Sequence, residues 1–193
     1  TFGYLPGLKS IPYDPAKAKA LLKEAGVAPG KELTFTIHTE SASLPNAPQV
    51  LEAIAGYLEA AGFKIVREPY DMAAWMSMMR GGKQPAVFYG TSAMPDDGGE
   101  LISGWYNTKA VWSAGNIRDP DYDKILADQF EMTDRKTRLT LLQKFAKLED
   151  ARRESVPLFW CGESFAVSNR IKDLKPAIGS PYHLKLQTVE LAK

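Results

Sequence analysis

The chain has 193 residues, of which 45% are hydrophobic and 24% are charged, as in an ordinary soluble globular protein with one substantial core. Its 24 basic and 23 acidic residues leave a net charge of +1 and form no basic patch interleaved with aromatics, so a nucleic-acid partner is not expected. No apolar run approaches the roughly 18 residues of a membrane span, and the single cysteine, Cys161, permits neither an internal disulfide nor a cysteine cage for zinc.

The N-terminal segment, residues 1–12, has the pattern of an extended linker. It lacks a basic start followed by an apolar core, so no signal peptide is visible, and we expect the chain to be a fragment. A helix is predicted next, over residues 13–26. Asp14 can accept free amides of its first turn, Pro15 suits its first position, and Gly26 can end it. Its apolar side chains predict packing beside the strand that follows.

Residues 31–69 predict a strand, a long helix and a second strand, around which the rest of the chain is organised. Leu33, Phe35 and Ile37 alternate with polar residues, which is the period of a strand with one buried face. The second strand is expected at residues 63–66. A connection of this length crosses over the sheet, so the two strands are predicted to be parallel neighbours in an α/β domain. The helix between them is expected to end at a left-handed Gly62, with an apolar face of Val50, Ile54, Tyr57, Leu58 and Ala61.

A polar loop at the end of a buried strand is the most promising place for a site. Asp71 is expected to cap a short helix that bears Met72, Trp75, Met76 and Met79, side chains that form a core or line an adaptable binding surface. Residues 86–89 then form a continuous apolar run, typical of a strand covered on both faces. The loop follows at residues 90–99. Open α/β sheets bind ligands beyond the carboxyl ends of their strands.

The remainder of the chain is predicted to be mainly helical. Residues 101–106 predict a short helix or an extended wedge, and Asp134 is expected to cap the longest helix, which runs to about Glu154. Residues 157–160 and 165–167 are expected to form two short strands. A helix opened by Asp119-Pro120 carries Tyr122, Ile125, Leu126, Gln129 and Phe130.

Residues that could carry catalysis or bind a metal are few and scattered. His38 and His183 lie far apart, and no GxSxG motif precedes a helix. Cys161 has no basic neighbour in sequence and is expected to be a small core residue. Asp96 and Asp97 precede two glycines, a pattern that favours a turn and could alternatively bind a cation. Neither a metal site nor a cofactor is therefore predicted.

Motifs in order along the chain resemble the extracellular solute-binding proteins of family 5, the peptide/nickel class of receptors for ABC importers. Residues 13–26 are similar to the family's helix leading into its third lobe, and residues 53–65 to its helix ending in glycine before a strand. Trp75 matches the aromatic of the next helix. Residues 119–126 (DPDYDKIL) resemble the family's N-P-E-Y-D-K-L helix, and residues 155–160 (SVPLFW) its V-P-L return strand. The order and spacing of these motifs make the match specific.

This resemblance implies the third lobe of a two-lobed periplasmic-binding-protein-like fold of class II, which is an α/β lobe with a mixed sheet and flanking helices. The expected organisation is a linker at residues 1–12, a solute-binding lobe at residues 13–154, and a segment at residues 155–193 that returns towards a first lobe.

The resemblance also implies a substrate-capture component of an ABC importer, which is not an enzyme. Such a protein binds a small solute, peptide-like or other, between two lobes by hinge closure and delivers it to a membrane permease. A periplasmic or extracellular location, association with the membrane through the transporter, and a monomeric state are expected. The alternatives are a solute-sensing lobe fused to a signalling or DNA-binding domain, and a hydrolase-like α/β enzyme. Ligand contacts are expected from Tyr89, Gly90, Thr91, Ser92, Ala93, Met94, Trp75 and Trp112.

The resemblance bears on the solute as well. Peptide receptors of the family carry an acidic residue in this loop, in the pattern A-D-Y-x-D-P, which pairs with the amino terminus of the peptide. Here residues 92–97 read SAMPDD, so that position falls on Ala93 or Met94, depending on a one-residue register. Neither side chain forms an ion pair, which leaves open a neutral, anionic or metal-complexed solute.

Overall fold

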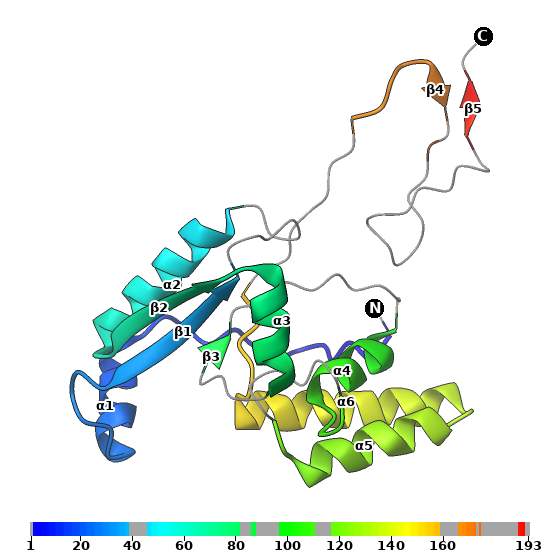
Figure 1. Cartoon of the computed structure of the whole chain (residues 1–193). Coiled ribbons are helices and arrows are strands. Elements are labelled where there is room, and N and C mark those ends of the chain that lie inside the picture. Colours follow the sequence, from blue (N-terminus) through cyan, green and yellow to red (C-terminus); the bar gives the residue numbers. More distant parts are fainter. Residues whose placement is uncertain are drawn as a thin grey trace. The chain divides into compact units, whose positions relative to one another are not determined.

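The computed structural model describes residues 2–38, 46–81, 86–87, 97–110, 117–158, 166–172, 174 and 189–191. The chain divides into two compact units (Figure 1). The sheet unit consists of Gly7–Gly90 and Thr108–Arg118, and the helical unit of Thr1–Pro6, Thr91–Asn107 and Asp119–Lys193. The boundary predicted after residue 154, between a solute-binding lobe and a returning segment, is a separate division of the chain and stays a prediction.

The described residues of the sheet unit form three parallel strands in the order β2-β1-β3. α2 packs against β2, and α3 packs against β1 and β2 (Figure 1). β1 and β2 are in register from Glu32 opposite Lys64 to His38 opposite Tyr70, which confirms the predicted parallel neighbours. The elements of this unit are α1 (Pro15–Glu24), β1 (Glu32–His38), α2 (Ala47–Ala61), β2 (Lys64–Tyr70), α3 (Met72–Gly81) and β3 (Ala86–Val87).

Local signals set the ends of these helices where they were predicted. The Asp14 carboxylate accepts the backbone amide of Lys17 at 2.8 Å and caps α1. The Asp71 carboxylate accepts the amide of Ala74 at 2.8 Å at the start of α3. Gly62 ends α2 with φ of 110°, a left-handed backbone conformation that residues other than glycine rarely adopt. These ends are fixed by chemistry that lies within four residues in sequence.

Burial in the sheet unit differs from the expected pattern in two places. The buried face of α2 consists of Leu51, Ala55 and Ala61, whereas Tyr57, predicted to lie on it, is 59% exposed. Tyr57 instead meets Tyr13 beside α1, with ring centroids 5.2 Å apart. α1 contacts α2 but buries no residue, so its packing is looser than its apolar pattern suggested.

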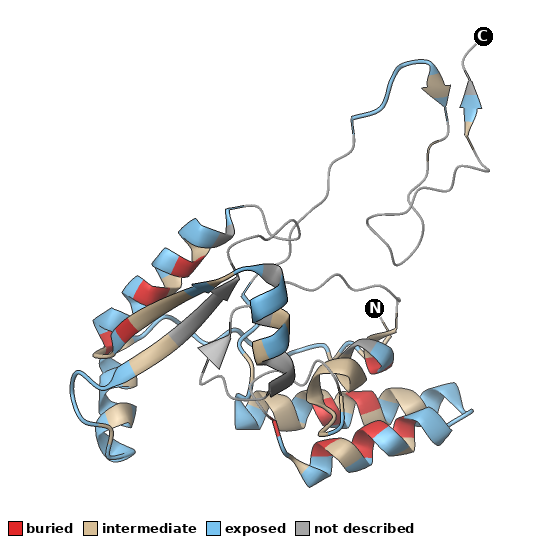
Figure 2. Ribbon diagram, in the orientation of Figure 1, coloured by how far each residue is buried: buried red, intermediate tan, exposed pale blue. Residues whose placement is uncertain are grey.

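The helical unit has its core between α5 (Pro120–Glu131) and α6 (Arg135–Arg152), which pack side by side (Figure 1). α4 (Gly98–Tyr106) packs against α5. Figure 2 shows buried positions along both long helices. Of the residues named for the predicted helix, Phe130 is 60% exposed, whereas Gln129 is fully buried. The buried side chains are Tyr122, Ile125, Leu126, Gln129, Leu142 and Phe145.

Asp119 and Asp134 cap α5 and α6 through side-chain bonds to the backbone amides of Asp121 (2.9 Å) and Thr137 (2.7 Å), as predicted. None of the helices in the described ranges combines the length and apolar character that a membrane span needs.

The two short strands expected near the C-terminus are not formed where the structure describes those positions. Residues 157–158 and 166–167 lie outside any strand. Pro157 has no amide to donate to a ladder, and the amide of Ser155 is bound by the Glu149 carboxylate at 2.8 Å. A short antiparallel pair forms further on, between β4 (Ile171–Lys172) and β5 (Glu190–Leu191).

Candidate functional site at the carboxyl end of the parallel sheet

The carboxyl ends of β1, β2 and β3 lie at one edge of the sheet, because the three strands are parallel. β1 ends at His38, directly opposite Tyr70 at the end of β2. The Tyr70 hydroxyl donates a hydrogen bond to Oε2 of Glu68 at 2.9 Å. That bond, together with partial burial, raises the pKa of Tyr70 above its ordinary value. A half-buried carboxylate and a phenol thus lie at the edge where α/β sheets bind ligands.

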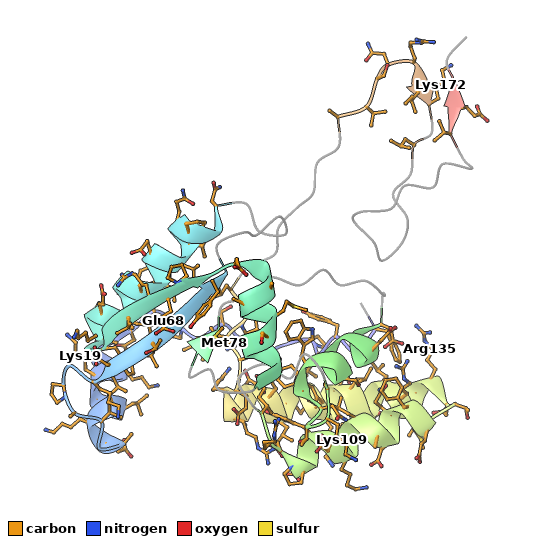
Figure 3. The ribbon with its side chains drawn as sticks, in the orientation of Figure 1. Lys19, Glu68, Met78, Lys109, Arg135 and Lys172 are labelled. Atoms are coloured by element: carbon orange, nitrogen blue, oxygen red, sulfur yellow. The ribbon has the colours of Figure 1, made fainter. Side chains whose placement is uncertain are left out.

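Glu68 and Tyr70 belong to the face of β2 that points away from α2. Arg67 marks the opposite face, because its guanidinium binds Glu52 and Glu59 of α2 at 2.9 and 3.1 Å. Successive side chains of a strand alternate between faces, so Glu68 and Tyr70 share the other one (Figure 3 labels Glu68). α3 covers that face, since two right-handed crossovers in opposite directions place α2 and α3 on opposite sides of the sheet.

Most of the expected ligand-contact residues lie outside the described part of the chain. These are Tyr89, Gly90, Thr91, Ser92, Ala93, Met94 and Trp112. Trp75 lies within α3, whose backbone is described. Their grouping into one site therefore stays a prediction.

The described pair of Glu68 and Tyr70 was not anticipated from the sequence. The predicted strand stopped at residue 66, whereas β2 continues through Pro69 to Tyr70. Polar residues on both faces concealed the strand: Arg67 lies on the face where it pairs with two glutamates of α2, and Glu68 lies on the other. The alternation of Val66, Glu68 and Tyr70 was the signal that could have revealed it.

The polar loop after β3 ends earlier than predicted, at Asp97. Gly98 and Gly99 were expected in the loop but form the first turn of α4. The Asp97 carboxylate caps that helix by accepting the amide of Gly99 at 2.8 Å. A hydrogen bond from Arg138, with the amide of Gly99 and the positive charge of Arg138, lowers the pKa of Asp97. Those contacts engage both Asp97 oxygens, so the structure favours the capping role of this residue over cation binding.

A second polar cluster surrounds Glu149 in the helical unit. Tyr122 donates to Oε2 of Glu149 at 2.5 Å, and the amide and hydroxyl of Ser155 both donate to Oε1 at 2.8 Å. The Tyr106 hydroxyl contacts both Glu149 and Ser155. Burial, opposed in part by the Ser155 bond, raises the pKa of Tyr106 to about 12, and burial likewise raises the pKa of Tyr122. Both phenols stay neutral near pH 7 and act as donors. The bonds from Ser155 to Glu149 hold the segment after α6 against that helix.

In the described ranges, no three side chains of His, Cys, Asp or Glu lie close enough together to hold a metal ion.

Comparison with known proteins gives a consistent family. The sequence model of the bacterial extracellular solute-binding proteins, family 5 Middle, matches residues 1–113. Di/tripeptide-binding protein 1 of Pseudomonas aeruginosa is 30% identical over 161 residues, which cover 81% of this chain and 29% of that protein. The resemblance drawn from the motifs is confirmed, and these matches give no support to the regulatory alternative.

Solved structures confirm the fold class. HbpA2 from Haemophilus parasuis matches with a TM-score of 0.71 and 25% identity, over 77% of this chain and 30% of that one. A dipeptide-binding protein from a Pseudoalteromonas species, in complex with Met-Leu, matches with a TM-score of 0.72 and 18% identity, over 93% of this chain and 36% of that one. The second likeness shows the fold alone. The chain spans roughly three-tenths of the length of the curated relatives that it matches.

Proposed function

Because the chain belongs to the bacterial extracellular solute-binding proteins of family 5, we propose that it forms one lobe of a substrate-capture protein that delivers a small solute to an ABC permease. Binding would close this lobe and a further one around the solute, and the permease would distinguish the closed receptor from the open one. Family membership also places the chain in a periplasmic or extracellular setting.

The observation that carries the proposal is the match of the family over residues 1–113, in a chain with the fold of solute-binding proteins. The relatives are about three times as long as this chain, which supports a further lobe as the source of the remaining solute contacts. This chain and that further lobe together make up the complete receptor. We propose further that it is a monomer without catalytic activity and without a nucleic-acid partner.

The solute contacts are assigned to the loop after β3 and to two aromatic side chains. The supporting observation is the direction of β3, which runs parallel to β1 and so ends at the same edge of the sheet as Glu68 and Tyr70. The proposed contact residues are Tyr89, Gly90, Thr91, Ser92, Ala93, Met94, Trp75 and Trp112.

The relatives named above include a di/tripeptide-binding protein, so a short peptide is the first solute to test. Ala93 or Met94 stands where peptide receptors of the family carry an acid, so the amino terminus of a peptide lacks its usual ionic partner in this loop. We therefore expect that any peptide bound here is held through its backbone and carboxylate, with little dependence on the charge of its amine.

Calorimetry with Met-Leu and N-acetyl-Met-Leu on the complete receptor tests both parts of this proposal. Equal affinities for the two compounds are expected, within about threefold. A loss of about tenfold or more on acetylation would show that an acid elsewhere pairs with the amine. Failure of both compounds to bind would remove short peptides as the solute. Mass spectrometry of Met-Leu after incubation should find it intact, and cleavage products would contradict the non-catalytic assignment.

The same titration on the 193-residue chain tests whether one lobe is sufficient. Halving the contacts of a micromolar ligand, about −8 kcal/mol, leaves roughly −4 kcal/mol, which corresponds to millimolar binding before the undiminished cost of association is counted. No detectable affinity is therefore expected. Comparable affinity in the chain and in the complete receptor would overturn the two-lobe mechanism.

A further inference from the structure

Helix α1 lies against α2 but buries no residue, so much of its surface is open to solvent, and Figure 2 shows no buried position on it. Among the described residues of the sheet unit, large apolar side chains are exposed only on α1, on the segment before it and at one position of α2. Exposed apolar side chains that occur singly are ordinary, whereas a group of them marks an interaction surface. Their exposed fractions lie between 48% and 68%, and they are Leu8, Ile11, Tyr13, Leu21 and Tyr57.

Two tyrosines connect this segment to α2. The ring centroids of Tyr13 and Tyr57 lie 5.2 Å apart, and the two side chains are 68% and 59% exposed. A tyrosine has an apolar ring and a polar hydroxyl, so it suits a boundary between water and an apolar medium. Together, residues 8–13, α1 and Tyr57 form the α1 face.

The same stretch concentrates positive charge. Residues 7–31 contain five lysines, no arginine and two acids, Asp14 and Glu24, so this stretch has a net charge of +3 in a chain whose total is +1. Asp14 already caps α1. None of the five lysines forms an ion pair with a described side chain, whereas Lys64 pairs with Glu32. All five are exposed (Figure 3 labels Lys19): Lys9, Lys17, Lys19, Lys23 and Lys31.

This face was not anticipated from the sequence, in which no basic patch interleaved with aromatics was recognised. The lysines are spread over residues 9–31, and Tyr57 comes from a different helix. The apolar side chains of α1 were expected to pack beside the following strand, whereas Leu21 is 54% exposed. Only the structure brings the exposed apolar side chains and the unpaired lysines into one region.

We propose that the α1 face is a docking surface for an anionic phospholipid membrane. Unpaired lysines are attracted by the negative surface potential of anionic lipids. Their apolar stems can lie along the headgroup region while the ammonium groups reach the lipid phosphates. The exposed leucine, isoleucine and tyrosine side chains supply apolar area that becomes buried at the level of the headgroups. Such a peripheral contact requires no membrane-spanning helix.

A soluble acidic partner, either a nucleic acid or a protein, is the rival to a membrane. Nucleic acids bind through phosphate contacts and through stacking on aromatic rings, and neither interaction uses exposed aliphatic side chains such as Leu8, Ile11 and Leu21. A receptor that delivers its solute to an ABC permease works beside a membrane, which favours lipid over a soluble partner. This choice of partner rests on the proposed function, whereas the exposure and the charge of the face do not.

Flotation of the 193-residue chain with lipid vesicles tests the proposal. Vesicles of phosphatidylcholine with about one quarter phosphatidylglycerol should bind the chain about tenfold or more tightly than pure phosphatidylcholine. This binding should weaken by about tenfold or more between about 0.01 M and about 1 M NaCl, as the Debye length falls from about 30 Å to about 3 Å. Equal binding to both vesicles, no binding to the anionic ones, or binding insensitive to salt would overturn the proposal. These measurements need no substitution, so they hold even where a variant fails to fold.

The contribution of charge is measured with two triple variants that change the net charge equally. K17Q/K19Q/K23Q neutralises α1 and should weaken binding to the anionic vesicles by about tenfold or more. The control is α6, where no described large apolar side chain is exposed and three exposed lysines likewise lack ion pairs. K136Q/K144Q/K147Q should therefore weaken binding by less than about threefold. Equal losses in the two variants would show that net charge alone attracts the vesicles, and would overturn the assignment to α1.

The contribution of apolar side chains separates a membrane from a soluble acidic partner. I11S/L21S keeps every lysine and should weaken binding to the anionic vesicles by about fivefold or more. F130S/V156S, at side chains that are 60% and 73% exposed in the helical unit, should change it by less than about twofold. Unchanged binding in I11S/L21S would mean that the face attracts anions without entering the headgroup region, and would overturn the membrane as its partner.

The complete receptor shows whether the α1 face stays accessible. It should bind the anionic vesicles within about threefold of the 193-residue chain. Loss of binding would show that the further lobe covers this face, and would overturn the proposal. No solute takes part in these measurements, so their failure would leave the proposed capture of a solute standing, and a failure to bind Met-Leu would leave the α1 face standing.

Discussion

The two units of this chain differ in how their described carboxylates are bound. In the helical unit, the carboxylates of Asp97 and Glu149 are partly buried and take up hydrogen bonds from several segments at once. In the sheet unit, the described ion pairs are more exposed than that of Asp97 and Arg138, as between Lys64 and Glu32, whose side chains are 68% and 58% exposed. Buried networks specify one arrangement, whereas exposed pairs contribute little.

The apolar cores differ in the same direction. The helical unit buries large side chains, with Tyr122, Leu126 and Phe145 at 4% exposure or less. Two of the residues that the sheet unit buries in α2 are alanines, Ala55 and Ala61. Among the described side chains, the buried aromatic residues, Tyr122 and Phe145, both lie in the helical unit. Substitutions should accordingly be felt more strongly in the helical unit, and the following experiments test that contrast.

The largest effect is expected from Phe145, which is 4% exposed and whose ring centroid lies 5.0 and 4.9 Å from those of Tyr106 and Tyr122. F145A should lower the free energy of unfolding by about 3–5 kcal/mol, because it removes buried surface and leaves a cavity. F130A, at a phenylalanine that is 60% exposed in the same unit, should change it by less than about 0.5 kcal/mol. Urea unfolding of both variants measures these changes. Similar decreases in the free energy of unfolding would mean that the core of the helical unit lies elsewhere.

Glu149 should come next, because its carboxylate accepts bonds from Tyr122 and from the amide and hydroxyl of Ser155. E149Q puts an NH₂ group against these donors and should cost about 1.5–3 kcal/mol, as for hydrogen bonds to a charged acceptor. E131Q, at an exposed glutamate that ends α5, is the control. Equal midpoints in urea for the two variants would show that the segment after α6 does not depend on this carboxylate.

The sequence was sufficient for features set by neighbouring residues. The caps at Asp14, Asp71, Asp119 and Asp134 were predicted because a cap and the amides that it binds are close in sequence. The parallel pairing of β1 and β2 followed from alternation and from the length of the crossover. Both signals are local or topological, and neither requires knowledge of tertiary contacts.

Features that depend on distant partners were not predicted. Arg67 on β2 finds its partners, Glu52 and Glu59, on α2, and no pattern within the strand shows this pairing. The pair of Asp97 and Arg138 joins residues 41 positions apart, and the buried Gln129 that orients it looked like any polar residue on a helix. The loop after β3 was singled out because it follows a buried strand, whereas the role of the loop in binding a solute came from the resemblance to a family.

Gly99 tests how tightly the buried network is packed. G99A places a methyl group within 2.5 Å of Gln129 and 2.7 Å of Arg138 and should destabilise the chain by about 1–3 kcal/mol. G104A is the control on the same helix, since a Cβ there meets none of the described neighbours within 4 Å. It should be neutral or stabilise by up to about 1 kcal/mol, as alanine does in a helix. A G99A variant as stable as G104A would show that the Arg138 cluster tolerates displacement, and would weaken the contrast between the two units.

The pH dependence of stability should reveal the Asp97 contact in the helical unit. Arg138 lowers the pKa of Asp97 in the folded chain below the ordinary value of 3.8, so the unfolded chain binds the proton more readily. The resulting stabilisation is present above pH 3.8 and is lost as the pH falls through the folded pKa. The difference in unfolding free energy between the unsubstituted chain and D97N should therefore shrink below about pH 4. D128N removes an exposed pair with Lys124 and should show a much weaker dependence on pH.

The smallest effect is expected from the sheet unit, at Arg67. Its Nε and Nη1 bind Glu52 and Glu59 at 2.9 and 3.1 Å, but these glutamate side chains are 61% and 44% exposed. Mobile ions screen such contacts over a Debye length of about 3 Å at 1 M salt, whereas a largely buried pair is screened much less. R67Q should therefore destabilise the chain less than R138Q at low salt, and the effect of R67Q should vanish in 1 M NaCl while that of R138Q persists. Urea unfolding of both variants at low and high salt measures this directly. A loss in R67Q that survives high salt would mean that the sheet unit also relies on a specific side-chain network, and the contrast between the units would have to be given up.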